Sequence, residues 1–480
     1  MHPARSLLAA LFLPLVTATA QSTPQVKIAY VMDSLPNGLH VIYSIDHSTP
    51  VVAVEVMYNV GSKHERQGKT GFAHLFEHVM FKGSRNVADG QHWGLLEKAG
   101  GRAGADINGT TSWDRTNYFE QVPSHQLDLA LWLEADRMGT LTETLTKEKL
   151  DNQREVVKNE RRQSFDNQPY GAWLEKALAF VYPAGHPYQH SVIGSMTDLT
   201  NASVDDVTSF FKTYYAPNNA VLVIAGDINL DEAKALVRKR FSWIPRGPAV
   251  PPRPNMTIGP VIGTEHHEVV QDANASAPAI YVAYRVPPAR AADGPAVDLL
   301  GDILAGGQAS PLYKSLVREK QIAVAVQSFN IGLVDGADML VFVALGKPGT
   351  NADSLEKALL TELDKGGTLV SQPLLDRSRA GSRYQVVNGL QSTGGFGGRA
   401  DQLAEGFTYY RDPNHVNNIL ARYDAVTVAQ LKRLAASRLI PTNRVRLVFV
   451  PKPKAAPAAS GGSGAADGDS SVRHLRFILR

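Results

Sequence analysis

Residues 71–81 read GFAHLFEHVMF, and this stretch places two histidines and a glutamate at helical spacing. In a helix, His74 and His78 lie one turn apart on the same face, with Glu77 beside them. Neutral imidazole nitrogen is a good zinc donor, and this spacing lets both rings reach one ion. Glu77 can then take a proton from a metal-bound water. The stretch therefore predicts a metal-binding helix.

The order His-x-x-Glu-His reverses the His-Glu-x-x-His order of many zinc proteases. A short pattern with three fixed positions recurs by chance, so it does not decide the function alone. The alternative is an amphipathic helix whose two histidines bind carboxylates or backbone carbonyls. Residues elsewhere in the chain must decide between the two.

The composition is that of an ordinary globular protein. The chain has 480 residues, 44% hydrophobic and 20% charged, which is enough for two or more cores. The formal net charge of +3 is small, and no basic cluster is interleaved with aromatic residues, so we expect no nucleic-acid partner. The chain has no cysteine, which excludes disulfides and thiolate ligands. Any metal must be held by His, Asp or Glu.

The first twenty residues have the three parts of a secretory signal peptide. Arg5 supplies the positive charge, residues 7–16 are apolar, and residues 18–20 (Ala-Thr-Ala) form a cleavage site. We expect the mature chain to begin at Gln21, in the periplasm of a Gram-negative host and secreted otherwise. The apolar run is too short to span a bilayer, and no later segment is long enough, so we expect no membrane span.

Strand patterns precede the histidine helix, and helical patterns dominate after it. Runs rich in β-branched residues, broken by turn residues such as Asn37 and Gly38, predict strands over residues 28–33, 40–45 and 51–60. We further expect a helix over 93–99, strands over 105–111 and 116–122, helices between 124 and 165, a loop from 169 to 188, a helix over 203–215 and a strand over 220–225.

Residues 245–254 contain five prolines, and the pattern partly repeats beyond them. A helix, an x-Pro-x-Asn turn and a strand recur over 215–223 and 439–448, and the strand at 51–60 resembles 279–286. We therefore expect an α+β fold of two homologous domains, each an antiparallel-rich sheet packed with helices. The expected parts are a metal-binding domain at 21–245, a linker at 246–258, a second domain at 259–453 and a flexible tail at 454–480.

The second copy lacks the metal-binding residues. Asp298, Gly301 and Asp302 stand where the histidine helix has its working residues. We expect only the first copy to hold a metal.

A catalytic zinc usually has three protein ligands, so a third must come from elsewhere. Glu155 and Glu160 belong to one helical run and point about 140° apart, so only one of them can reach a given ion. Val156 and Val157 mark the inward face, and Glu160 shares it. We therefore expect Glu160 to be the third ligand and Glu155 to be a solvated surface charge.

These motifs together resemble the pitrilysin or insulinase family of zinc peptidases, over about residues 27–453. The inverted motif matches His74, Glu77 and His78, and the run at 154–160 (REVVKNE) matches the segment that ends in the family's third ligand, Glu160. Residues 108–118 resemble the edge strand that pairs with the substrate backbone. The resemblance implies one zinc ion and substrate binding by Asn108, Gly109 and Thr110.

Two positions depart from the family pattern. Gln153 stands where the family often has a second glutamate near the site, which keeps hydrogen bonding but loses charge. The family's second half also supplies an Arg and Tyr pair that holds the scissile carbonyl; Arg318 matches the arginine, whereas Val324 stands in place of the tyrosine.

The predicted function is that of an exported zinc metalloendopeptidase that cleaves peptides or unfolded segments held extended in an enclosed chamber. A non-catalytic binding or scaffold subunit is the competing class, and a metal-storage protein is a third, which would not need Glu77. Because Val324 cannot donate the hydrogen bond of a tyrosine hydroxyl, we expect a related, metal-free partner chain that supplies the Arg and Tyr pair. A homodimer that relies on Arg318 alone, or on Tyr313, is the alternative.

Overall fold

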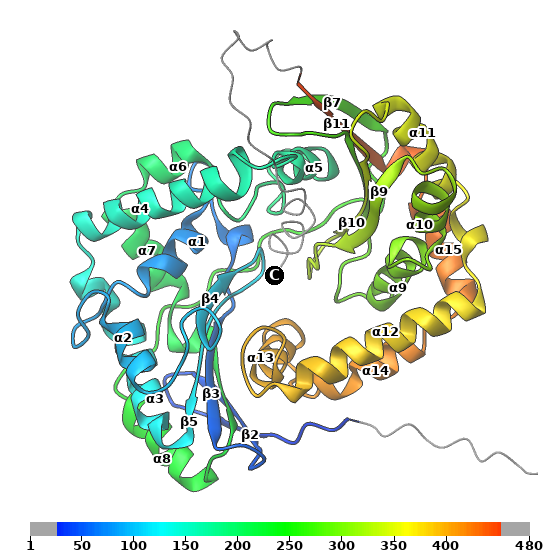
Figure 1. Cartoon of the computed structure of the whole chain (residues 1–480). Helices are drawn as coiled ribbons and strands as arrows, with labels where there is room; N and C mark the ends of the chain where they lie inside the picture. Colours follow the sequence, from blue (N-terminus) through cyan, green and yellow to red (C-terminus); the bar gives the residue numbers. More distant parts are fainter. Residues whose placement is uncertain (1–25, 453–480) are drawn as a thin grey trace, which may run out of the picture.

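The computed structural model describes residues 26–452 and contains two β-sheets, each packed with helices (Figure 1). The expected signal peptide at 1–20, its cleavage site and the tail at 454–480 lie outside the described residues. The mixed α+β fold that the sequence predicts is confirmed. Among helices in the described part, none is long and apolar enough to cross a bilayer.

The strands of the first sheet lie in the order β1-β2-β6-β3-β5-β4, and those of the second in the order β7-β11-β8-β10-β9. The strand bounds are β1 Val31–Ser34, β2 His40–Ile45, β3 Val51–Tyr58, β4 Ile107–Thr111, β5 Thr116–Pro123, β6 Ala220–Gly226, β7 His266–Asp272, β8 Ala279–Val286, β9 Ala323–Asn330, β10 Asp338–Gly346 and β11 Arg444–Pro451. The main helices are α1 Phe72–Val79, α2 Gln91–Lys98, α3 Leu127–Thr144, α4 Lys147–Arg161, α5 Trp173–Val181, α6 Met196–Asn201, α7 Val204–Tyr214, α8 Leu230–Phe241, α9 Gly294–Ala305, α10 Pro311–Tyr313, α11 Ala352–Leu363, α12 Gln372–Gln391, α13 Arg399–Tyr410, α14 His415–Asp424 and α15 Val428–Arg438.

The two sheets repeat one topology. In the first, β2 runs parallel to β6, and β3, β5 and β4 follow in antiparallel order. In the second, β7 runs parallel to β11, and β8, β10 and β9 follow in the same way. The edge strand β9 therefore corresponds to the edge strand β4, and α9 corresponds to α1.

Each sheet is covered on one face by helices of its own copy and on the other by a helix of the opposite copy. Alternate residues of β3 point to opposite faces: Val54 packs in the cluster that contains α1 and α3, whereas Ala53 and Met57 pack against α13. Likewise, α5 of the first copy packs on the second sheet. Burial on both faces explains why β3 is almost continuously apolar.

Three features of the first copy differ from the sequence prediction. The first strand begins at Val31 rather than at residue 28, and α8 follows β6 without having been predicted. The expected loop at 169–188 was wrong, because α5 lies inside it. Trp173, Ala177 and Val181 of α5 are buried and have helical spacing. This pattern is short and lies between prolines and tyrosines, which is why the helix was not predicted.

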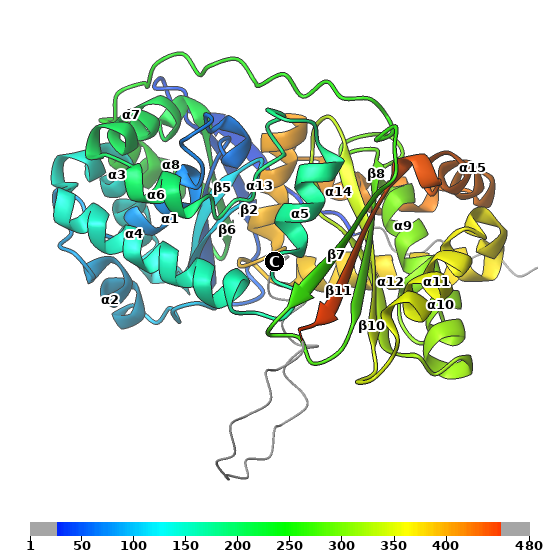
Figure 2. The ribbon, with the colours of Figure 1, turned by 90° about the horizontal axis from the view of Figure 1, so that it is seen from above.

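The chain passes from one copy to the other through residues 245–265, which form no helix or strand and run as an extended segment in Figure 2. This agrees with the proline-rich composition there. The domain bounds given above stay a prediction.

Candidate metal centre

The helix α1 carries both histidines and is anchored at its start by a buried carboxylate. Gly71 precedes α1 with φ of 85°, and a Cβ there would lie 2.7 Å from the Ile193 carbonyl oxygen, so glycine is required. The carboxylate of Glu65 accepts hydrogen bonds from the backbone N–H groups of Gly71 (2.8 Å) and Ala73 (2.7 Å). Burial raises the pKa of Glu65 to about 8. Glu65 was not predicted, because a capping residue six positions before Gly71 leaves no local pattern.

Packing then fixes which face of α1 is turned to the site. Phe72, Leu75, Phe76 and Val79 are buried in the core of the first copy, at helical spacing. His74 and His78 occupy the remaining face, with their ring centroids 4.8 Å apart. The predicted helix, with both histidines on one side, is therefore present.

The helix α4 brings Glu160 to the two histidines. Thr146 caps α4 by accepting the Lys149 N–H, and α4 packs against α1 (Figure 1). Glu160 Oε2 lies 3.3 Å from His78 Nε2 and 3.7 Å from His74 Nε2. Within the described residues, these three are the group whose donor atoms all lie within 4.8 Å of one another.

One of the two valines predicted on the inward face of α4 does not lie there. Val157 is buried, but Val156 is 42% exposed and does not belong to the inward face. Leu150, Gln153 and Val157 define that face, and Glu160 continues their spacing. Glu155 lies outside it and pairs with Lys158 at 2.8 Å.

The electrostatics of the group are those of two imidazoles sharing one carboxylate. Burial lowers the pKa of His74. Burial acts in the same direction on His78, but the hydrogen bond with Glu160 and the charges of Glu77 and Glu160 outweigh it and raise the pKa of His78. Burial acts to raise the pKa of Glu160, but the two histidines together lower it.

The donor set fits a zinc ion. Two imidazole nitrogens and a carboxylate oxygen are a known catalytic zinc set. The 3.7 Å separation of His74 and Glu160 is too long for a hydrogen bond, so pairing between side chains does not explain why this imidazole is buried there. The Nδ1 atom of His74 is also buried without a hydrogen-bond partner among the described residues. The role of His74, His78 and Glu160 as zinc ligands stays a prediction.

Glu77 lies beside the two histidines and contacts the edge strand β4. Its Oε2 atom accepts a hydrogen bond of 2.7 Å from Thr111 Oγ1. A Cβ added at Gly109 would lie 3.1 Å from Glu77 Cγ and 3.0 Å from Tyr118 Cδ1, so the glycine lets the strand approach the helix closely. The contact between Glu77 and Thr111 was not predicted. The sequence could have indicated it, because Gly109 and Thr111 are two residues apart on one strand and therefore point to the same face.

We expect Gly109→Val to lower kcat/KM for peptides by about tenfold or more, because the added side chain pushes β4 away from Glu77. Metal content should be unchanged, since Gly109 lies outside the ligand group. Metal analysis and peptide cleavage on the same preparation check both parts. Equal activity in this variant and the unaltered chain would contradict the close approach that we describe.

The remaining predicted site residues lie in different places. Asn108 and Thr110 lie on β4, which is an edge strand as expected. Gln153 is buried and donates to Asn152 at 2.7 Å, so its amide is oriented by its neighbour rather than by a ligand.

Arg318 belongs to the second copy and lies away from the histidines. It donates to Gln308 at 3.3 Å, and its guanidinium lies 5.8 Å from the ring centroid of Tyr313. The helix α10, which comes just before it in the chain, is on the opposite side of the molecule from α1 in both views (Figures 1 and 2). Val324 is 45% exposed at the start of β9. The structure therefore does not bring Arg318 to Glu77 within one chain.

The equivalent position in the second copy holds a different arrangement. The carboxylate of Asp298 on α9 accepts hydrogen bonds from Asn330 (2.7 Å) and the Tyr423 hydroxyl (2.5 Å). Gly301 lies against Ser328, where a Cβ would be 3.2 Å from its hydroxyl oxygen. Asp298 is thus already hydrogen-bonded by side chains of its own half.

Comparison with known proteins places the chain in a family. The profile described as insulinase (peptidase family M16) matches residues 40–193, and the profile described as the peptidase M16 inactive domain matches residues 201–381. The zinc protease PqqE of Helicobacter pylori is 33% identical over 380 residues, which cover 78% of this chain and 83% of that protein. The chain belongs to the insulinase family. The resemblance seen in the sequence is thereby confirmed.

Two solved structures support the fold. A crystal structure of a protease from Helicobacter pylori has a TM-score of 0.81 at 28% identity, covering 88% of this chain and all (100%) of that one. The first half of the periplasmic protease PqqL of Escherichia coli has a TM-score of 0.70 at 19% identity, covering 90% and 93%. The full PqqL sequence is longer, since the match covers only 30% of it. Several relatives are named zinc proteases, which supports a protease family.

Proposed function

We propose that this chain is an exported zinc endopeptidase that hydrolyses peptides or unfolded segments bound in an extended conformation within an enclosed chamber. The observation that carries the proposal is the meeting of three elements at one point. The helices α1 and α4 supply the donor group of His74, His78 and Glu160. The edge strand β4 reaches Glu77 through Thr111.

Each residue of the candidate site has a separate role in this proposal. His74, His78 and Glu160 would hold zinc, which when bound supplies a Lewis acid that polarises a carbonyl and lowers the pKa of a water. Glu77 accepts the proton of the attacking water, and Thr111 orients its carboxylate. The free edge of β4, including Asn108, Gly109 and Thr110, pairs with substrate backbone, so recognition tolerates many sequences.

The alternative is a non-catalytic binding or scaffold subunit. The profile named the M16 inactive domain matches residues 201–381, which follow the donor group in the chain, and the Asp298 arrangement belongs to the second copy. The donor group and Glu77 belong to the first copy, and a scaffold subunit has no use for a carboxylate positioned beside such a group. This favours the enzyme.

Metal analysis and peptide cleavage of the purified mature chain, with and without a chelator, test the proposal. We expect about one zinc per chain, hydrolysis that the chelator abolishes, and recovery when zinc is restored. A metal-free chain that cleaves peptides, or a zinc-loaded chain that cleaves none in any assembly, would refute it.

We further propose that activity requires a related, metal-free chain that contributes an Arg and Tyr pair. Arg318 contacts Gln308 and Tyr313 in its own chain, and Val324 cannot donate a hydrogen bond to an oxyanion. Loss of one such donor typically costs about 10²- to 10³-fold in kcat. A homodimer would carry the defect in both sites.

We therefore expect the chain purified alone to show weak peptidase activity and to gain roughly a hundredfold when the related chain is co-expressed. Solution mass and peptidase rate of each preparation measure this. A fully active homodimer would rule out the heterodimer. Val324→Tyr in the chain alone provides a second test, since it restores the missing hydroxyl at the position where the family has it.

Export and cleavage after Ala20 remain part of the proposal. One relative supports this location, since PqqL of Escherichia coli is described as periplasmic. N-terminal sequencing of the chain from the periplasmic fraction should begin at Gln21.

A further inference from the structure

The two faces of the edge strand β4 meet different surroundings. Gly109 and Thr111 face Glu77 on α1. Thr110 faces the other way: its hydroxyl donates to Asn117, whose amide lies 3.4 Å from Asp401 on α13. Successive residues of a strand alternate between faces. If substrate adds to β4 as proposed above, the residue opposite Gly109 faces the metal centre and its neighbour opposite Thr110 faces α13.

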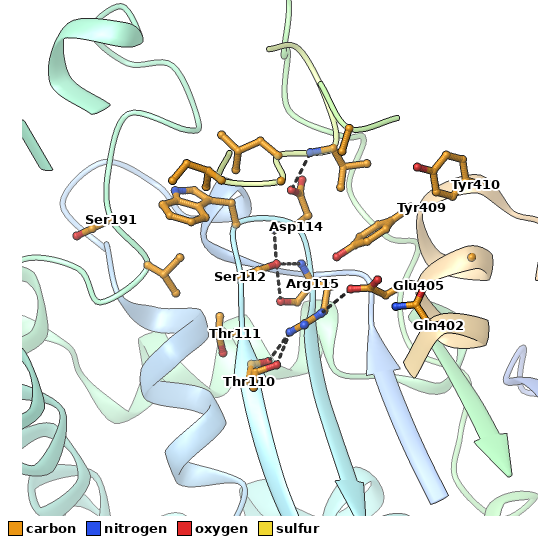
Figure 3. A pocket seen from close by; sticks show the side chains of 18 of the residues that line it. Thr110, Thr111, Ser112, Asp114, Arg115, Ser191, Gln402, Glu405, Tyr409 and Tyr410 are labelled. Carbon is orange, nitrogen blue, oxygen red and sulfur yellow. Dashed lines mark hydrogen bonds and ion pairs between the residues drawn. The ribbon is translucent and has the colours of Figure 1, made fainter. Parts of the chain in front are cut away.

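A cavity of about 470 Å³ lies where that neighbour would point. It is enclosed by the β4–β5 turn at residues 112–115, by α13 and by the segment at 331–334 of the second copy (Figure 3). Trp113, Leu333 and Val334 supply apolar wall, and Arg115, Glu405 and Tyr409 lie at its polar end. The cavity begins one residue from the strand position that faces Glu77, within reach of a substrate side chain.

The guanidinium of Arg115 is only partly used by the protein. Its Nη1 atom donates to the Thr110 carbonyl (3.2 Å), the Thr110 hydroxyl and Asn117 Oδ1 (3.2 Å). Its Nε atom is buried and has no hydrogen-bond partner among the described residues, and it lies at ion-pair distance from Glu405 Oε1 (3.8 Å; Figure 3). One edge of the guanidinium fork is therefore committed to β4, while the Nε and Nη2 edge, which suits a carboxylate, makes no such bond within residues 26–452.

The acidic groups around Arg115 have other partners or a raised pKa. Asp401 accepts a hydrogen bond from the Gly397 N–H (2.8 Å), and Glu55, whose pKa is raised by burial, accepts one from the Asn117 amide (2.8 Å). The Asp114 carboxylate is already bound by Lys63 (2.7 Å), the Tyr188 hydroxyl (2.6 Å) and the Val334 N–H (3.2 Å). Burial and the charge of Asp401 raise the pKa of Glu405 to about 8. Glu405 therefore offers a hydroxyl donor rather than a negative charge near neutral pH, and it would not repel an incoming carboxylate.

We propose that this cavity is a specificity subsite that binds a substrate carboxylate through Arg115. The carboxylate is either an acidic side chain at the residue opposite Thr110 or the C-terminal carboxylate of a peptide that ends there. The inference rests on the proposed binding of substrate along β4. The simpler explanation is that Arg115 only holds Thr110 in place. In that case, replacing Arg115 would weaken the binding of all peptides equally.

Equilibrium binding of peptides distinguishes a carboxylate subsite from a purely structural role of Arg115. The probe is a set of fluorescent peptides with Glu, Gln or Lys at each successive position, in C-terminal acid and amide forms. They are titrated into the zinc-loaded chain carrying Glu77→Gln, which keeps them intact. We expect Glu to bind about tenfold tighter than Gln at one position only, or the acid tighter than the amide if the C-terminus is the ligand.

Arg115→Gln in the same background should abolish this difference. Arg102→Gln is the matched control: it removes one positive charge just before β4, and Arg102 is paired with Asp106 and 76% exposed. The control should keep the preference. Taking the ratio of Glu to Gln affinities within each variant removes any general effect on the strand.

A uniform loss for all peptides in Arg115→Gln would overturn the inference and leave Arg115 as a brace. The absence of any Glu or C-terminal preference in the parent would also overturn it. Failure of the proposed function would look different: the unaltered, zinc-loaded chain would bind peptides with the preference but cleave none of them.

Discussion

Glu77→Gln should bind metal as the unaltered chain does and lose peptide hydrolysis by about 10²- to 10⁴-fold. The amide keeps the shape of the side chain, and its oxygen can still accept the hydrogen bond that Thr111 Oγ1 gives to Glu77. It cannot accept a proton from water at neutral pH. The loss should therefore be in kcat, with little change in KM.

Metal analysis, thermal stability and steady-state kinetics of the same preparation measure the effect. Thr111→Val is a useful companion, because it leaves the carboxylate but removes its hydrogen-bond donor. Its loss should be smaller than that of Glu77→Gln. Near-normal turnover in Glu77→Gln would remove this residue from the mechanism, whereas a simultaneous loss of metal would mean that it also supports the ligand group.

The features that the sequence predicted are those set by local periodicity. The spacing of Phe72, Phe76 and Val79 defines the buried face of α1, so the position of the two histidines follows from it. The x-Pro-x-Asn turns before β6 and β11 revealed the repeat, because the same turn leads into a strand at the same place in both sheets. Such signals lie within a few residues of one another.

Features that depend on contacts between distant segments were not predicted. Nothing in the local sequence of α5 or α13 indicates that each covers the sheet of the opposite copy. Val156 has the same residue type as Val157, yet only Val157 meets the core, so valine alone did not mark the inward face. Glu65 caps α1 across a turn, and the joining of the Arg115 region to the second copy depends on tertiary packing.

The ligand group gives the other large expected effect. His78→Ala and Glu160→Ala should each weaken zinc binding by more than about a hundredfold and abolish chelator-sensitive hydrolysis. Loss of a residue that contacts the metal costs more than the 10–100-fold typical of residues that only hold such a ligand in place. Zinc should also stop raising the melting temperature in these variants, because only a metal that binds the folded state stabilises it.

Glu155→Ala is the matched control, because it removes a carboxylate from the same helix. Glu155 is more than half exposed and pairs with Lys158, whereas Glu160 lies within 3.7 Å of both imidazoles. Exposed pairs of this kind contribute about 1 kcal/mol or less, so this variant should keep zinc, activity and stability. If Glu155→Ala stripped the metal and Glu160→Ala kept it, α4 would have to be rotated by more than a third of a turn, and Leu150 and Val157 would leave the core. A ligand role for Glu155 is thus incompatible with the packing that positions α4 beside α1.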